Sequence, residues 1–219
     1  MLRSVMDSIL ILAALLNLAM LATSRMAACI RTFAVQSLLL ALLPVAVGFS
    51  HDAAPGVHVF AIAAGTMGLK VLLIPWILLR VLRSGEIHRE VEPFIGFTAS
   101  VLLGALIIVA SFAFADGMPL PSRAPTDLLV PVAVATLFNG LLILVSRAKA
   151  ITQVLGYLVV ENGVFVFGLL LLDQTPALVE LGILLDLFVG VFIMGIVVYH
   201  IRREFDHMDT HLLDALRES

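Results

Sequence analysis

The chain has 219 residues, of which 61% are hydrophobic and 13% are charged, and its formal net charge is −3. Soluble domains are about 45–50% apolar. This composition and a mean hydropathy of +1.12 therefore predict an integral membrane protein and exclude a large water-soluble catalytic domain. The single cysteine, Cys29, excludes a disulfide framework and a cysteine-ligated cluster.

Seven stretches are long and apolar enough to cross a bilayer as helices, which takes about 20 residues each. They are 4–24, 31–50, 57–82, 92–115, 127–146, 150–172 and 177–201. A Pro-rich loop over 117–126 divides a four-helix part (1–116) from a three-helix part (127–203), and an amphipathic tail follows over 204–219. The sequence therefore predicts an all-α integral membrane protein with about seven transmembrane helices.

Lysine and arginine residues are unevenly divided between the two ends of the expected helices. Ten of them follow the first, third, fifth and seventh stretches, whereas Arg3 and Arg123 lie on the other side and Lys70 lies within a stretch. Cytoplasmic connections carry the excess of basic residues. We therefore expect the N-terminus outside and the C-terminus in the cytoplasm.

Three ionisable residues, Lys70, Glu161 and Asp186, lie near the middle of otherwise apolar stretches. A charge at the bilayer centre costs about 2.5–3.5 kcal/mol on insertion scales, so such a residue marks a functional site by default. Two acids and one base in a small chain predict a buried proton or ion path.

Asp186 has Gly182 one turn before it and Gly190 one turn after it, on the same helical face. The missing side chains leave room for water or for another backbone around the carboxylate. The alternative is a packing groove with one polar anchor.

Glu161 has Tyr157 one turn before it as a potential hydrogen-bond partner, and Asn162 follows on an adjoining face. Its alternative role is a structural hydrogen bond to another helix. Lys70 precedes Pro75, which frees a backbone carbonyl and can kink the helix. We expect Lys70 either to have a partner carboxylate or to be a neutral amine. A static pair with an acid is its structural alternative.

Weaker polar residues inside the stretches are expected to form hydrogen bonds between helices. They are Asn17, Gln36, Thr66, Thr98, Ser100, Ser111, Thr136 and Asn139, and Asn139 and Gln36 could extend a wet path. No two histidines face each other at one depth, which argues against a transmembrane haem. Because no phosphate loop, nucleophile elbow or metal-ligand cluster is present, we expect no cofactor, no metal and no nucleic-acid partner.

The last three stretches resemble the small three-helix subunit of complex I and of multisubunit cation/proton antiporters (NuoK and MrpC types). The matching features are the basic turn Ser146-Arg147-Ala148-Lys149, Leu155-Gly156 followed by Asn162, and Asp186 four residues before Gly190. One departure concerns the second of these helices, where the family usually has an acidic residue and this chain has Leu158 at that position. The acid stands three residues later, at Glu161, about 4.5 Å further along the axis.

The whole chain resembles the hydrogenase-4 component E family, through Lys70-Val71-Leu72-Leu73-Ile74-Pro75 together with Glu161-Asn162-Gly163. This resemblance implies a subunit of a complex-I-like membrane arm, as in a group 4 hydrogenase or formate hydrogenlyase, in the plasma membrane of a bacterium or archaeon. It implies antiporter-like and other membrane-arm subunits as partners, with lipid around them. The redox centres would belong to a peripheral nickel–iron hydrogenase-like module, so this chain would carry no redox chemistry of its own.

Four functions remain open at this point. The first is a proton relay through Lys70, Glu161 and Asp186 in a redox-driven complex. The second is an antiporter subunit without a redox partner, which shares the same three-helix module. The third is a structural scaffold whose three charges form a static group. The fourth is a standalone transporter, which inverted repeats would support, but none is found between the two halves.

Overall fold

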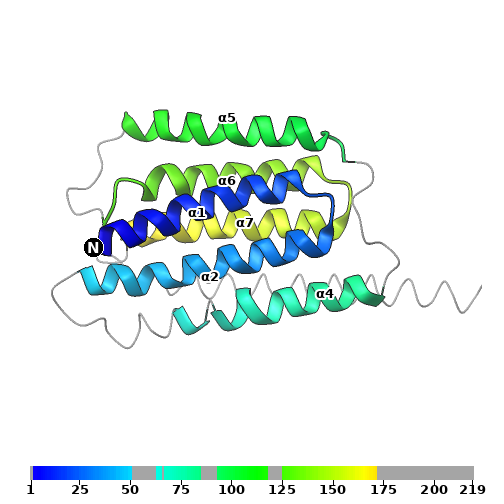
Figure 1. Ribbon diagram of the computed structural model, residues 1–219, viewed down its shortest axis with the longest axis horizontal. Coiled ribbons are helices and arrows are strands. Elements are labelled where there is room, and N and C mark those ends of the chain that lie inside the picture. The colour runs from blue at the N-terminus through cyan, green and yellow to red at the C-terminus, as the bar shows by residue number, and fades with distance from the viewer. Residues whose placement is uncertain (1, 51–62, 66, 85–92, 118–124, 172–219) are drawn as a thin grey trace, which may run out of the picture.

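The computed structural model describes residues 2–50, 63–65, 67–84, 93–117 and 125–171, and its main elements are helices (Figure 1). In chain order these are α1 (Leu2–Ala22), α2 (Met26–Ser50), the π-helical η1 (Met67–Leu73), α4 (Ile74–Ser84), α5 (Phe97–Asp116), α6 (Leu129–Ser146), α7 (Ala150–Gly168) and the short 3-10 turn η2 (Leu169–Leu171). Within the described residues, six helical stretches are long and apolar enough to cross a membrane. The prediction of an all-α integral membrane protein is confirmed.

These six stretches correspond to the first six that the sequence predicts. The seventh, over 177–201, and the tail over 204–219 lie outside the described residues. The helices run side by side, with α1, α2, α6 and α7 packed together (Figure 1). Helix α5 packs on α1 and α6, and η1 with α4 packs on α2.

Two helices begin five residues away from the apolar boundaries in the sequence. Helix α2 begins at Met26 rather than at 31, so Arg31 lies inside its second turn with an exposed side chain. A long basic side chain can cover apolar surface with its stem while its charged end stays in water, so the helix continues past the charge. Helix α5 begins at Phe97 rather than at 92, after Pro93 and the extended N-cap residue Gly96.

Helices α6 and α7 form a tight hairpin because glycines bring their backbones together. A Cβ atom on Gly140 would lie 2.6 Å from the Val160 amide nitrogen. One on Gly156 would lie 2.6 Å from the Leu144 nitrogen, and one on Gly163 would lie 2.6 Å from the Leu137 nitrogen. Real Cβ atoms do not approach backbone so closely. The hairpin therefore depends on these three positions lacking side chains.

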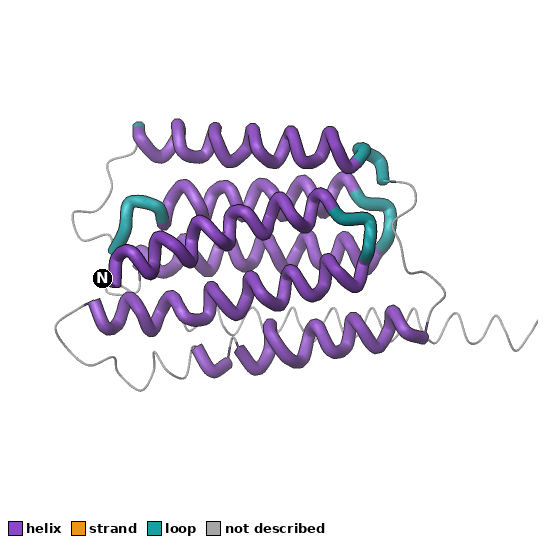
Figure 2. Tube along the Cα trace, in the orientation of Figure 1, coloured by secondary structure: helices purple, strands orange, loops and turns teal. Residues whose placement is uncertain are grey.

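The connections from α1 to α2 and from α6 to α7 lie at the same end of the bundle, opposite the N-terminus (Figure 2). Arg147 sits between helix ends there and is 2% exposed. Its guanidinium donates to the Leu21 carbonyl over 2.6 Å and lies 4.4 Å from the centre of the Phe97 ring. Arg147 therefore ties the ends of α1, α5 and α6 together, a role that counting it as a loop charge did not reveal.

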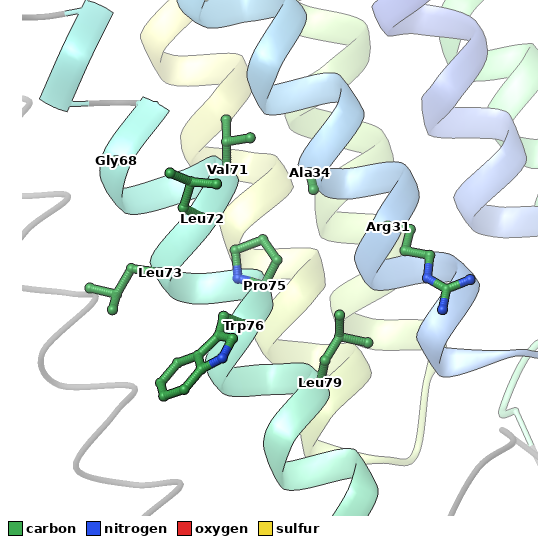
Figure 3. Close-up of a pocket in the computed structure, with 9 residues that line it drawn as sticks. All are labelled: Arg31, Ala34, Gly68, Val71, Leu72, Leu73, Pro75, Trp76 and Leu79. Atoms are coloured by element: carbon green, nitrogen blue, oxygen red, sulfur yellow. The ribbon is translucent and has the colours of Figure 1, made fainter.

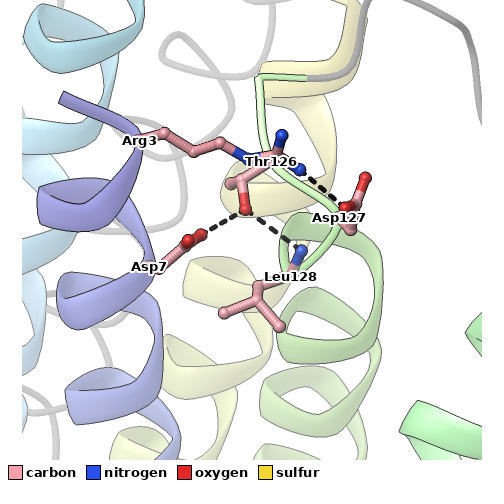
Figure 4. Close-up of polar contacts among 5 residues, drawn as sticks. All are labelled: Arg3, Asp7, Thr126, Asp127 and Leu128. Atoms are coloured by element: carbon pink, nitrogen blue, oxygen red, sulfur yellow. Dashed lines mark hydrogen bonds and ion pairs between the residues drawn. The ribbon is translucent and has the colours of Figure 1, made fainter. Parts of the chain in front are cut away.

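The opposite end is held by polar contacts between the start of α1 and the start of α6 (Figure 4). Arg3 pairs with Asp127 over 2.6 Å, and the Thr126 hydroxyl donates to the Asp7 carboxylate. The Thr126 oxygen also accepts the Leu128 amide over 3.3 Å. Together with the Arg147 contact to Leu21, these contacts fix α1 and α6 in register at both ends.

Candidate functional site

Lys70 lies in η1, where the helix widens to π geometry just before Pro75. Proline has no amide hydrogen and cannot close the α-helical bond to the carbonyl four residues earlier. Such π segments occur frequently at functional sites. The Lys70 residue is 1% exposed and is directed into the bundle.

The ammonium group of Lys70 meets the carboxylate of Glu161 on α7. The Nζ and Oε2 atoms are 3.5 Å apart, and the two side chains are 2% and 8% exposed. Removing one partner of a buried ion pair is costly because the other charge stays uncompensated. The structure thus brings together Lys70 and Glu161, two of the three charges that the sequence places near the middle of apolar stretches.

Asn162, the neighbour of Glu161, connects the ion pair to the rest of the bundle. Lys70 Nζ donates to Asn162 Oδ1 over 3.4 Å. The Asn162 amide nitrogen then donates to Gln36 Oε1 over 3.3 Å and to Ser37 Oγ over 3.1 Å, both on α2. Asn162 is 2% exposed, and Gln36 and Ser37 are fully buried.

The hydrogen bonds continue from α2 into α1 and α6. Gln36 Nε2 donates to Asn17 Oδ1 over 2.7 Å and to the Ala13 carbonyl over 3.0 Å. Asn17 Nδ2 donates to Thr136 Oγ1 over 3.0 Å. We call the residues Lys70, Asn162, Gln36, Asn17 and Thr136 the amide chain, since three side-chain amides link the lysine to the threonine.

The sequence-based expectation treated Asn17, Gln36 and Thr136 as separate contacts between helices, and it missed that they form one chain. For Gln36, Thr136 and Asn162 a signal was present in their similar depths, whereas Asn17 lies five residues from the end of α1. Depth is counted from the end of the bundle at which α1 connects to α2 and α6 connects to α7. Gln36 and Thr136 each lie ten residues from that end of their helices, and Asn162 lies twelve residues from that end of α7. At 1.5 Å per residue these positions are about 15–18 Å from that end.

Asn139 lies one turn beyond Thr136 on α6 and is fully buried. Within the described part of the chain, neither its Nδ2 nor its Oδ1 has a hydrogen-bond partner. Its Oδ1 faces Gly104 of α5, where a Cβ atom would lie 2.8 Å away. Asn139 therefore borders the amide chain without joining it.

This contrast predicts losses of stability of different size for two similar substitutions. Asn17→Leu removes the bond from the Gln36 nitrogen, which keeps its bond to the Ala13 carbonyl, and the bond to the buried Thr136 hydroxyl; this should cost about 1–3 kcal/mol of unfolding free energy. Asn139→Leu removes no hydrogen bond to the described residues, so the loss should stay within about 0.5 kcal/mol. Reversible unfolding in mixed detergent micelles measures both, and equal losses would contradict the assignment.

An apolar groove runs along the outside of α2 and the η1–α4 segment (Figure 3). It is lined by Arg31, Ala34, Gly68, Val71, Leu72, Leu73, Pro75, Trp76 and Leu79. Lys70 and Glu161 are not among the lining residues. Among the described residues, no group of three or more His, Cys, Asp or Glu side chains is placed to hold a metal ion.

The sequence has known relatives of similar length. It is 30% identical over 193 residues to an uncharacterized protein of Mycobacterium tuberculosis (strain ATCC 25618 / H37Rv), covering 87% of this chain and 84% of the relative. It is 30% identical over 148 residues to hydrogenase-4 component E from Escherichia coli (strain K12) and from Shigella flexneri, covering 68% of this chain and 68% of each relative. The chain belongs to the hydrogenase-4 component E family. No family model and no solved structure matches it.

The family assignment confirms the resemblance to hydrogenase-4 component E, and the likeness to the three-helix subunit of complex I stays a prediction. The two segments that carried the family resemblance, around Lys70 and around Glu161, are those that the structure joins by the ion pair. Tyr157 lies partly buried one turn before Glu161 on α7. Asp186, Gly182 and Gly190 lie outside the described residues.

Proposed function

We propose that this chain is a membrane-arm subunit of a redox-driven, ion-translocating complex of the hydrogenase type, in which Lys70, Glu161 and Asp186 relay protons. The observation that carries the proposal is the Lys70–Glu161 ion pair, 3.5 Å across and almost fully buried, in a member of the hydrogenase-4 component E family. Charges inside a membrane protein mark ion and proton pathways.

A proton relay follows from the electrostatics of the pair. While the Lys70 ammonium is close, the buried Glu161 carboxylate is compensated. Moving the ammonium away leaves an uncompensated buried charge, and uptake of a proton on a Glu161 carboxyl oxygen relieves that cost. Return of Lys70 favours release of the proton. Asp186 on the expected seventh helix is the next acid in this scheme.

The chemistry of electron transfer is assigned to partner subunits. We infer that antiporter-like and other membrane-arm subunits flank this chain in a bacterial or archaeal plasma membrane, with a peripheral nickel–iron hydrogenase-like module attached. Copurification of the tagged chain from its host membrane tests this. Recovery of hydrogenase-type subunits supports the proposal, whereas recovery of antiporter subunits alone overturns its redox part.

The relay is tested by Glu161→Gln in the intact complex, because the amide keeps the shape of the side chain and removes the proton site. We expect the subunit composition to stay unchanged and proton translocation in membrane vesicles to fall by about 100-fold or more. Asp127→Asn is the matched control, since it neutralises an acid of an ion pair whose side chains are 61% and 77% exposed. Full translocation by the Glu161→Gln complex would overturn the relay.

A further inference from the structure

The amide chain has one direction, and two groups at different points of it impose that direction. The Lys70 ammonium can only donate, so the Asn162 oxygen must face it and the Asn162 nitrogen must face Gln36. The Ala13 carbonyl can only accept, so the Gln36 nitrogen must face α1. Both groups require the same arrangement. Every amide therefore directs its oxygen toward Lys70 and its nitrogen toward Thr136.

A row of aligned amides is polarised, because each hydrogen bond strengthens the dipole of the next one in a low-dielectric interior. The negative, oxygen end of this row lies on Lys70, and the three amides Asn162, Gln36 and Asn17 are 2%, 0% and 0% exposed. Such an arrangement stabilises a positive charge at Lys70. It adds to the attraction of Glu161 from a different direction.

The same three groups are poor proton conductors. An amide nitrogen in this row already carries its hydrogens and has no lone pair with which to accept another. Passing a proton through the row would require each amide to convert to its imidic acid form. Hydroxyls or water conduct without such a change, but the row between Lys70 and Thr136 consists of amides in series.

We propose that Asn162, Gln36 and Asn17 are positioning residues that hold Lys70 as an ammonium group, oriented toward Glu161, through a polarised row of amides that itself conducts no protons. The meaning of this row for translocation rests on the proposed function. The charge and the hydrogen bonding of Lys70 do not depend on that function.

Lys70 can be observed directly because the sequence has two lysines, Lys70 and Lys149. In a Lys149→Arg background, labelling with lysine carrying 15N at Nζ gives one side-chain signal. The full chain in lipid nanodiscs is examined by NMR at neutral pH, where the 15N shift separates ammonium from amine. The exchange of the Nζ hydrogens with water is measured in the same sample. We expect one ammonium signal with slow exchange.

Gln36→Met breaks the row at its centre with a side chain of similar length. We expect the 15N signal of Lys70 to move and its hydrogens to exchange about tenfold faster, because the Asn162 amide loses the acceptor that polarises it and Lys70 is cut off from the rest of the row. Asn17→Leu, one bond further away, should have a smaller effect of the same sign. Ser37→Ala is the control, since the adjacent Ser37 takes a side branch from Asn162 outside the row.

An amine signal in the unaltered row, or equal signals and exchange rates for Gln36→Met, Asn17→Leu and Ser37→Ala, would overturn the proposal. Proton conduction is tested separately with Thr136→Val, which removes the hydroxyl group at the end of the amide chain. A polarised row predicts that translocation by the intact complex falls by no more than about twofold. A proton wire predicts its loss. Full translocation by Glu161→Gln together with the expected NMR changes would reject the proposed function and leave the polarised row standing.

Discussion

Replacing Lys70 with Met is expected to lower the unfolding free energy by about 3–5 kcal/mol, since it leaves the Glu161 carboxylate buried without its cation. The double variant Lys70→Met/Glu161→Gln should recover most of this loss, because neither charge remains. Reversible unfolding of Lys70→Met, Glu161→Gln and the double variant in mixed micelles forms a double-mutant cycle with the parent chain. This cycle gives the coupling energy between the two side chains.

The exposed ion pair between Arg3 and Asp127, at the start of α1 and of α6, is the control for this cycle. Arg3 and Asp127 approach to 2.6 Å, closer than Lys70 and Glu161, but their side chains are mostly exposed. Surface ion pairs contribute about 0–1 kcal/mol. A coupling energy for Arg3–Asp127 as large as that for Lys70–Glu161 would contradict the importance we assign to burial.

The double variant also separates a relay from a scaffold. A static ion pair can be replaced by neutral groups with little loss, so a scaffold would keep translocation once both charges are removed. A relay would not, because no group that takes up a proton remains at this position of α7. Stable complexes without proton translocation support the relay, and stable complexes with normal translocation support the scaffold.

Adding one methyl group at Gly156 should disrupt the α6–α7 hairpin. The new Cβ would lie 2.6 Å from the Leu144 nitrogen, so one backbone must move, and overpacking of this kind costs about 1–3 kcal/mol. Because α7 carries Glu161 and Asn162, the shift should also lengthen their contacts to Lys70 and Gln36. We expect Gly156→Ala to lower both the unfolding free energy and proton translocation.

Gly168→Ala is the matched control on the same helix, because no atom lies within 4 Å of a Cβ atom built there. Alanine has the higher helix propensity by about 1 kcal/mol, so this variant should be as stable as the parent chain or more stable. Equal destabilisation by Gly156→Ala and Gly168→Ala would show that the close approach of α6 and α7 contributes little. Unfolding in mixed micelles and vesicle assays measure the two effects.

Hydropathy was sufficient for the six helical stretches that the structure describes, because each needs a long apolar run to cross the bilayer. It misplaced the start of α2, where Arg31 continues the helix beyond the apolar run, and the start of α5, where Pro93 and Gly96 delay the helix. Apolar length measures the bilayer crossing, while backbone hydrogen bonds set where a helix ends.

The candidate site was only partly accessible from sequence. Lys70 and Glu161 stand out because charge is rare in apolar stretches, and the motifs around them carried the predicted family resemblance. The amides Asn17, Gln36 and Asn162 do not stand out, since their joining depends on how the three helices α1, α2 and α7 are rotated about their axes. Arg147 was hidden for a related reason, because a basic residue in a turn is normally exposed, whereas this one is 2% exposed between helix ends.

The glycine contacts between α6 and α7 and the Arg147 clamp have a mechanical consequence for the ion pair. Glu161 is carried by a hairpin whose two backbones are in contact and whose turn is tied to α1 and α5, so it belongs to the stiff side of the bundle. Lys70 stands on a π segment with irregular backbone bonding next to a proline, and its helix packs on α2. A force that separates the two charges would therefore displace the ammonium group while the carboxylate keeps its place.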